Sequence, residues 1–100
     1  MSMSIEFLPE ARLEFDEAAD WYEEQREGLR TEFVQAVDTA INRIASAPRS
    51  YPIIEGSFTR RALLYKFPYS VIYSIENEGL LIYAIFHNSR NPLIWRGRIG

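Results

Sequence analysis

Between residues 60 and 98 the chain gathers the side chains most able to bind or transform another molecule. They flank and follow two apolar segments, and they combine guanidinium, ammonium, imidazole and indole groups. Guanidinium groups pair with carboxylates and phosphates, and aromatic rings stack on flat or cationic groups. This composition predicts a surface that holds an acidic or stacking partner. The candidate partner-binding residues are Arg60, Arg61, Lys66, His87, Arg90, Trp95 and Arg96.

His87 ends the second apolar segment, and strict strand alternation places it on the same side as Leu81, Tyr83 and Ile85. Two interpretations of this histidine stay open with equal weight. It caps the sheet with one ring nitrogen on a backbone carbonyl, or it binds a partner. A metal site at this position is far less favoured than either.

The two neighbouring arginines, Arg60 and Arg61, point to opposite faces if they lie on a strand, so only one of them can face a given partner. Either one could instead pair with an acidic side chain of the first helix. For Trp95 an apolar anchor that orders the tail is favoured over a platform for a ligand.

Several kinds of chemistry are disfavoured by what the chain lacks. The sequence has no cysteine and a single histidine, which excludes thiolate metal sites and sites built on several imidazoles. No Gly-rich phosphate loop and no Gly-rich turn around a nucleophilic serine is present. The acidic row between residues 10 and 27 is interpreted as a solvated helix face. We therefore expect no cofactor and no metal.

Length and composition favour one soluble domain over residues 1–100. With 100 residues, of which 47% are hydrophobic, the chain has room for one modest core. The absence of cysteine, of a signal peptide and of a long apolar run predicts a cytoplasmic protein with no membrane segment. Residues 1–38 carry eleven acidic and three basic side chains, and residues 39–100 carry three acidic and eight basic ones. The resulting charges of −8 and +5 suggest that the second half meets an anionic partner.

Local patterns predict a strand and a helical hairpin in the first half. Residues 4–8 alternate briefly, and Pro9 suits the first position of a helix that stops at Gly28. An apolar stripe on this helix recurs at spacings of three and four, at Ala11, Phe15, Ala18, Ala19 and Tyr22. Leu13 and Trp21 interrupt its acidic face, either as covers for other elements or as part of an interface. A second helix runs from about residue 30 to 46, with an apolar stripe at the helical period.

The second half reads as a loop followed by three strands. Residues 48–56 form the loop, which Tyr51 and Ile53 hold by packing inward, and a strand follows over residues 58–65. Residues 67–75 and 80–87 form a hairpin with a short polar turn. The order strand–helix–helix–strand–strand–strand predicts an α+β domain, β-α-α-β-β-β, in which an antiparallel sheet buries one face against the helical hairpin.

Two segments resemble the ParE branch of the RelE/ParE toxins of bacterial toxin–antitoxin modules. They are RRALLYKFPYSVIY at residues 60–73 and HNSRNPLIWR at residues 87–96. AADWYE at residues 18–23 and APRSYP at residues 47–52 also look like that family, so the resemblance covers nearly the whole chain. It implies the same β-α-α-β-β-β fold, a cognate antitoxin as partner, and the role of a plasmid-stabilisation toxin.

The resemblance leaves two targets, because RelE-like members cut mRNA on the ribosome and ParE-like members inhibit DNA gyrase. The ribonuclease branch typically carries an arginine where this chain has Ser70, and a tail tyrosine where the nearest aromatic here is Trp95. These differences favour a non-catalytic gyrase inhibitor with no catalytic residue. The alternative is a ribosome-dependent endoribonuclease that handles phosphate with His87, Arg61 and Arg90. A third possibility is a degenerate member that binds antitoxin but is not toxic.

Overall fold

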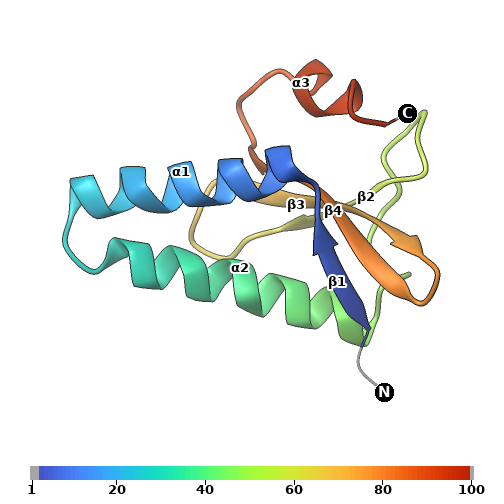
Figure 1. Cartoon of the computed structure of the whole chain (residues 1–100), viewed down its shortest axis with the longest axis horizontal. Helices are drawn as coiled ribbons and strands as arrows, with labels where there is room; N and C mark the ends of the chain where they lie inside the picture. Colours follow the sequence, from blue (N-terminus) through green and yellow to red (C-terminus); the bar gives the residue numbers. More distant parts are fainter. Residues whose placement is uncertain (1–2, 100) are drawn as a thin grey trace.

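The computed structural model describes residues 3–99, and its elements follow the predicted order with one short helix added at the end (Figure 1). The added helix lies in the tail, for which the sequence patterns predict no regular structure. The elements are β1 (Ser4–Phe7), α1 (Pro9–Gln25), α2 (Leu29–Ser46), β2 (Arg60–Leu63), β3 (Tyr69–Glu76), β4 (Gly79–His87) and α3 (Leu93–Arg96).

The sheet is mixed, with the strand order β1-β4-β3-β2. The antiparallel prediction holds for β2, β3 and β4, but β1 runs parallel to β4. The connection between these parallel neighbours contains both helices as well as β2 and β3, so the first strand of the chain docks on the last. Gly79 permits this close approach, because a Cβ there would lie 2.9 Å from the carbonyl oxygen of Ser4.

The helical hairpin turns slightly earlier than predicted. The first helix ends at Gln25, and Gly28, with φ of 93°, precedes the second helix instead of stopping the first. A left-handed backbone of this kind suits glycine. The carboxylate of Glu23 accepts the N–H of Gly28 and, at 3.0 Å, that of Arg30, which fastens the turn.

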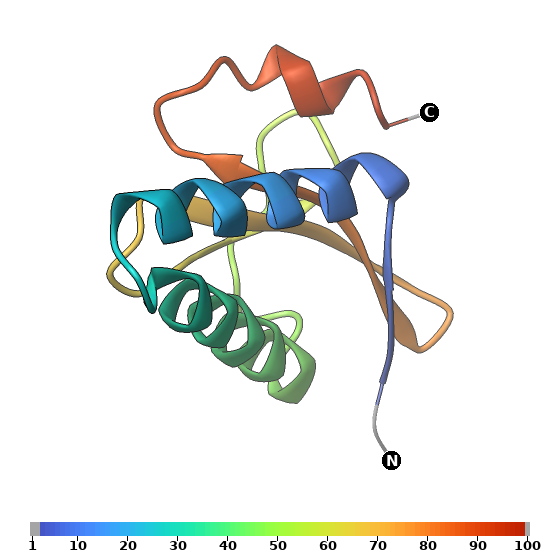
Figure 2. The ribbon, with the colours of Figure 1, turned by 60° about the vertical axis from the view of Figure 1, so that its left-hand side comes forward.

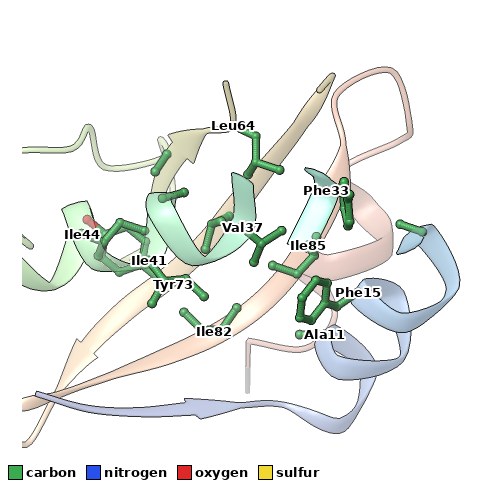
Figure 3. Close-up of a cluster of buried hydrophobic side chains, with 14 of the residues drawn as sticks. Ala11, Phe15, Phe33, Val37, Ile41, Ile44, Leu64, Tyr73, Ile82 and Ile85 are labelled. Carbon is green, nitrogen blue, oxygen red and sulfur yellow. The ribbon is translucent and has the colours of Figure 1, made fainter. Parts of the chain in front are cut away.

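The main core lies between the helical hairpin and one face of the sheet (Figure 3). From the helices, Phe15, Phe33 and Val37 point toward Ile82 and Ile85 of the sheet, and all five are buried. Both predicted apolar stripes are thereby confirmed in their buried members. Leu13 and Trp21, which interrupt the acidic face of α1, have exposed fractions of 58% and 55%. Both side chains are thus largely exposed, although Trp21 lines a hollow that Tyr69 and His87 of the sheet also line.

The opposite face of the sheet is also covered, by the C-terminal tail (Figure 2). Trp95 is 2% exposed and packs with Ile72, Tyr83 and Phe86, which confirms its interpretation as an anchor. The prediction of one buried face was therefore incomplete. Short tails become ordered only when apolar contacts compensate for the lost conformational entropy, and this tail has them.

An ion pair adds to the attachment of the tail. Arg98 donates twice to the carboxylate of Glu14, each time at 2.9 Å, and once to the carbonyl of Tyr83. Glu14 also accepts the backbone N–H of Ile85. The interpretation of the whole acidic row as a solvated face is thus wrong for Glu14, since a bidentate pair with few solvent contacts holds it against the sheet.

The loop before β2 departs from prediction in one side chain. Tyr51 packs against the core as predicted, but Ile53 is exposed, and Ile54 packs beneath the tail instead. The strand itself is shorter than residues 58–65, because Ile54 donates to the carbonyl of Thr59 and closes a turn there. Within residues 3–99, no helix has the length and apolarity needed to cross a membrane.

Candidate functional site: an arginine pocket beside the C-terminal tail

A hollow of about 170 Å³ lies between the tail and the sheet, and we call it the arginine pocket. Three guanidinium groups surround it, and its remaining wall is largely apolar. Its position depends on the tail, because α3 supplies one side and the ends of β2, β3 and β4 supply the other. The lining residues are Ile54, Arg61, Ser70, Ile72, Phe86, Asn88, Arg90, Pro92, Trp95 and Arg96.

Arg61 is the most closely held of the three arginines. Its Nε donates to Ser70 Oγ at 3.0 Å and its Nη2 donates to Asn88 Oδ1 at 3.2 Å. Ser70 in turn donates to the same Asn88 oxygen, at 2.5 Å. Because Ser70 is buried, this three-residue network fixes the guanidinium before any ligand arrives.

Sequence reasoning did not select Ser70 and Asn88 as site residues. The sequence singles out Ser70 only because it stands where a related branch carries arginine, and it offers no comparable reason to select Asn88. The two residues are eighteen positions apart, and the pairing of β3 with β4 brings them together. The available signal for Asn88 was its place directly after a strand and beside His87. Which residue Asn88 contacts depends on the register between strands, which the sequence does not give.

Arg90 and Arg96 contribute charge to the pocket and lie against aromatic rings. The guanidinium of Arg90 is 5.9 Å from the ring centre of Phe86, and that of Arg96 is 5.3 Å from the ring centre of Trp95. Arg96 also donates to the carbonyl of Glu55. None of the three pocket arginines, Arg61, Arg90 and Arg96, forms an ion pair within residues 3–99. The pocket therefore keeps a net positive charge.

Of the candidate residues, Arg60 and Lys66 lie outside the pocket lining, and Trp95 lines it as a buried side chain. Arg60 points to the other face of the sheet and donates to the carbonyls of Arg49 and Tyr51, at 3.1 and 2.6 Å, so it holds the loop. Lys66 has φ of 72° and lies over the ring of Tyr65, away from the pocket. Trp95 forms part of the pocket wall but is itself buried.

His87 lies on the opposite side of the sheet from Arg61, and here the simple alternation rule was wrong. The register of β3 and β4 shifts by one residue between Ile72 and Tyr73, which is a β-bulge. Beyond this shift the side-chain alternation reverses. Leu81 and Tyr83 therefore pack with the tail cluster, whereas Ile85 points to the helices. His87, two residues after Ile85, points the same way and packs against Tyr69.

The surroundings of His87 differ from the capping interpretation, because its Nδ1 pairs with Ser89 and not with a backbone carbonyl, while its role in partner binding stays a prediction. Its Nδ1 lies 3.1 Å from the backbone nitrogen of Ser89, which donates to it, and 2.8 Å from the Ser89 hydroxyl. Its ring packs edge-on against Tyr69, with centres 5.1 Å apart. Burial raises the pKa of Tyr69, and this effect outweighs the nearby positive charge of Arg90, which lowers the pKa. The Tyr69 hydroxyl therefore stays neutral at physiological pH.

The resulting geometry favours anion binding over acid–base chemistry. Arg61 and His87 occupy different hollows, and Arg90 lines both of them. A phosphate held by Arg61 would therefore have the sheet between it and the imidazole. Among residues 3–99, no group of three or more His, Cys, Asp or Glu side chains is arranged to hold a metal ion.

Comparison with known proteins identifies the family. Residues 5–92 match the family model described as ParE toxin of type II toxin-antitoxin system, parDE. A solved structure titled "Chromosomal ParDE TA system from P. aeruginosa" superposes with a TM-score of 0.74 at 17% identity, covering 86% of this chain and 96% of that chain. No curated protein matches by sequence. Since the family model spans most of the chain, this protein belongs to the ParE toxin family of type II toxin–antitoxin systems.

Proposed function

We propose that this chain is the toxin of a type II module, that a cognate antitoxin neutralises it, and that it acts in the cytoplasm by binding DNA gyrase without catalysing a reaction. The antitoxin is supported by the family and by the similar P. aeruginosa structure, whose title describes a ParDE system. The mode of action is supported by the separation of Arg61 from His87, which is the observation that carries the proposal.

RNA cleavage by attack of the ribose 2′-hydroxyl needs a proton acceptor, a proton donor and a cation around one phosphate. The alternative ribonuclease would assign these tasks to His87, Arg61 and Arg90. In this chain the first two lie on opposite faces of the sheet, and Ser70 stands where an additional arginine would face Arg61. The arrangement supports tight binding of an anionic group and argues against proton transfer to it.

The arginine pocket supplies a binding mode for both proposed partners. Arg61 is held in place, two further guanidiniums flank it, and the floor is apolar. An acidic segment of gyrase with an apolar side chain fits this combination of charge and shape. Acidic side chains of the antitoxin that enter the same pocket would exclude gyrase, which accounts for neutralisation by competition.

The test compares two purified activities in parallel: inhibition of gyrase supercoiling, and cleavage of mRNA on translating ribosomes. The double variant Arg61→Glu/Arg90→Glu should lose gyrase inhibition and antitoxin binding by more than about tenfold. The matched control Arg12→Glu/Arg30→Glu makes the same charge change on another surface. It removes two exposed ion pairs and the contacts of the Arg12 guanidinium with the rings of Phe7 and Phe15, none of which lies in the arginine pocket, so inhibition should stay close to wild type.

The His87→Gln variant separates the two candidate functions. The amide keeps a hydrogen-bonding group at this position, so stoichiometric inhibition should persist within about threefold. A general acid–base role would instead cost about a hundredfold or more in cleavage rate. Codon-positioned mRNA cleavage by the wild-type protein, without any effect on gyrase, would replace this proposal by the ribonuclease alternative.

A further inference from the structure

The first helix, α1, carries an exposed tryptophan that the fold does not bury. The side chain of Trp21 is 55% exposed. Its ring packs edge-on against Tyr22, with ring centres 5.1 Å apart, so one side of the indole is supported and the rest is open to solvent. Tryptophan contributes more to protein–protein contacts than most residues, because a rigid ring brings a large apolar area at a small cost in entropy.

Two carboxylates flank this ring on the surface of α1. Glu17 lies four residues before Trp21 and Glu24 lies three residues after it, so all three side chains share one face of the helix. Both glutamates are exposed, and within residues 3–99 neither takes part in an ion pair. The neighbouring acids Glu14 and Asp20 are each paired with an arginine. We call Glu17, Trp21 and Glu24 the tryptophan face.

The arginine pocket has the complementary composition. Its three arginines form no ion pair within residues 3–99, and its wall includes the apolar side chains of Ile72 and Phe86. Guanidinium groups pair with carboxylates through two parallel hydrogen bonds, and an indole ring gains by leaving water for an apolar wall. An indole with a carboxylate on either side therefore matches the pocket in both charge and polarity.

The tryptophan face and the arginine pocket meet at one residue. Arg90 lines the pocket, and it also lines the hollow of about 200 Å³ to which Glu17 and Trp21 contribute. A surface that carries both members of a complementary pair is self-complementary. A two-fold axis through such a surface lets each of two copies fill the pocket of the other, and the assembly closes as a dimer.

We propose that two copies of this chain pair about a two-fold axis, each placing Trp21 in the arginine pocket of the other and setting Glu17 and Glu24 against its guanidinium groups. The contact surface is small, so the dimer is reversible and forms at micromolar concentration. Its formation covers the pocket, and any other occupant must displace the second copy. The inference rests on the geometry of the pocket and requires no particular cellular target.

The experiment uses the full-length chain alone. Sedimentation velocity from about 1 µM to about 300 µM, in about 0.05 M salt, should show a monomer converting to a dimer. Raising the salt to about 0.5 M should increase the dissociation constant by more than about tenfold, because the paired charges are screened. Acrylamide quenching of fluorescence should fall as the dimer forms. This signal reports Trp21, since Trp95, the other tryptophan of the chain, is already buried in the monomer.

Variants of the tryptophan face test its part in the contact. Trp21→Ala and Glu17→Arg/Glu24→Arg should each weaken the dimer by more than about tenfold. The matched control Glu6→Arg/Glu78→Arg makes the same charge change on exposed residues near the β3–β4 turn, at the other end of the sheet from the pocket. It should dimerise like the wild type. Far-UV circular dichroism checks that each variant is folded.

A charge exchange tests whether the two surfaces meet each other. Arg61→Glu/Arg90→Glu should be monomeric by itself, because both its tryptophan face and its pocket are then acidic. Glu17→Arg/Glu24→Arg should be monomeric because both of its surfaces are basic. In an equimolar mixture each contact again joins opposite charges, so a mixed dimer should form with a dissociation constant within about tenfold of the wild-type value.

Three outcomes would overturn the inference. The first is a wild-type chain that stays monomeric over the whole concentration range at low salt. The second is a dimer that persists in the variants of both surfaces, which would place the contact elsewhere. The third is a series of larger species, which would exclude closure about a two-fold axis. Because no gyrase is present in these measurements, failure of the proposed gyrase target would leave their result unchanged.

Discussion

At the scale of single residues, the properties of Arg61 depend on two uncharged neighbours. Ser70 and Asn88 accept hydrogen bonds from its guanidinium and bond to each other, so the arginine is held without loss of its charge. A carboxylate in either place would hold the guanidinium as well, but it would cancel the attraction for an anionic partner. The network thus combines fixed geometry with full positive charge.

Replacement of Asn88 by alanine tests this network. The change removes the acceptor shared by Arg61 and Ser70 and leaves the Ser70 hydroxyl buried without it. We expect a loss of about 1–3 kcal/mol in the free energy of unfolding. Inhibition should fall by about tenfold, because the guanidinium is no longer fixed. Urea denaturation and the supercoiling assay measure the two effects, and unchanged inhibition would show that Arg61 needs no positioning.

Tyr73 allows a prediction about pH. Its hydroxyl donates to the carbonyl of Pro48 at 2.6 Å, and burial raises the pKa of Tyr73 to about 12. Between pH 10 and that value the unfolded chain loses this proton while the folded chain keeps it. The free energy of unfolding should therefore fall as the pH rises through this window. Urea titrations at several alkaline pH values measure the slope, which should be shallower in Tyr73→Phe.

At the scale of elements, the C-terminal tail joins the fold to the site. It covers the second sheet face through Trp95, and it is fastened to α1 through the pair of Arg98 with Glu14. The same segment supplies one wall of the arginine pocket. The lining of the pocket is therefore complete only when the tail is docked on the sheet.

Shortening the tail tests that coupling. Removal of the chain from Asn91 onward should abolish inhibition, because the pocket loses a wall and one of its arginines. Trp95→Ala should cost about 3–5 kcal/mol of stability, as expected for truncation of a buried aromatic residue. As a control, Leu93→Ala changes an exposed side chain of the same helix and should have little effect on either quantity. Full inhibition by the shortened chain would place the functional surface elsewhere.

At the scale of the whole molecule, the two halves of the chain carry opposite charge, −8 and +5. The fold builds the arginine pocket from residues of the positive half, while most acidic side chains lie on the exposed sides of α1 and the turn after it. This arrangement orients an acidic partner toward β2 and away from the helical hairpin.

The salt dependence of gyrase inhibition should reveal this separation of charge. Raising the salt concentration from about 0.05 M to 0.3 M shortens the Debye length and screens exposed charges. Inhibition of gyrase by the wild-type chain should weaken several-fold over this range, and inhibition by Arg12→Glu/Arg30→Glu should weaken to a similar extent. An equal salt response from Arg61→Glu/Arg90→Glu, measured at its own higher working concentration, would exclude the pocket as the charged contact.

Local patterns were sufficient to determine the element order, the buried stripes of both helices and the family. The apolar period of α2 and the hairpin of β3 and β4 are properties of neighbouring residues, so they can be read without knowing what packs on them. The anchoring role of Trp95 could also be predicted, because a tail needs an apolar side chain that ties it to the core before it becomes ordered.

Only the tertiary structure decided which side chains share a surface. One residue of register shift in β4 moved His87 to the face opposite Arg61, and no local pattern marks that bulge. The pair of Glu14 with Arg98 joins residues eighty-four positions apart, and Ser70 meets Asn88 only because two strands align. Such contacts depend on the packing of distant segments, and they determine that this chain presents three arginines around one pocket with its histidine on the other face.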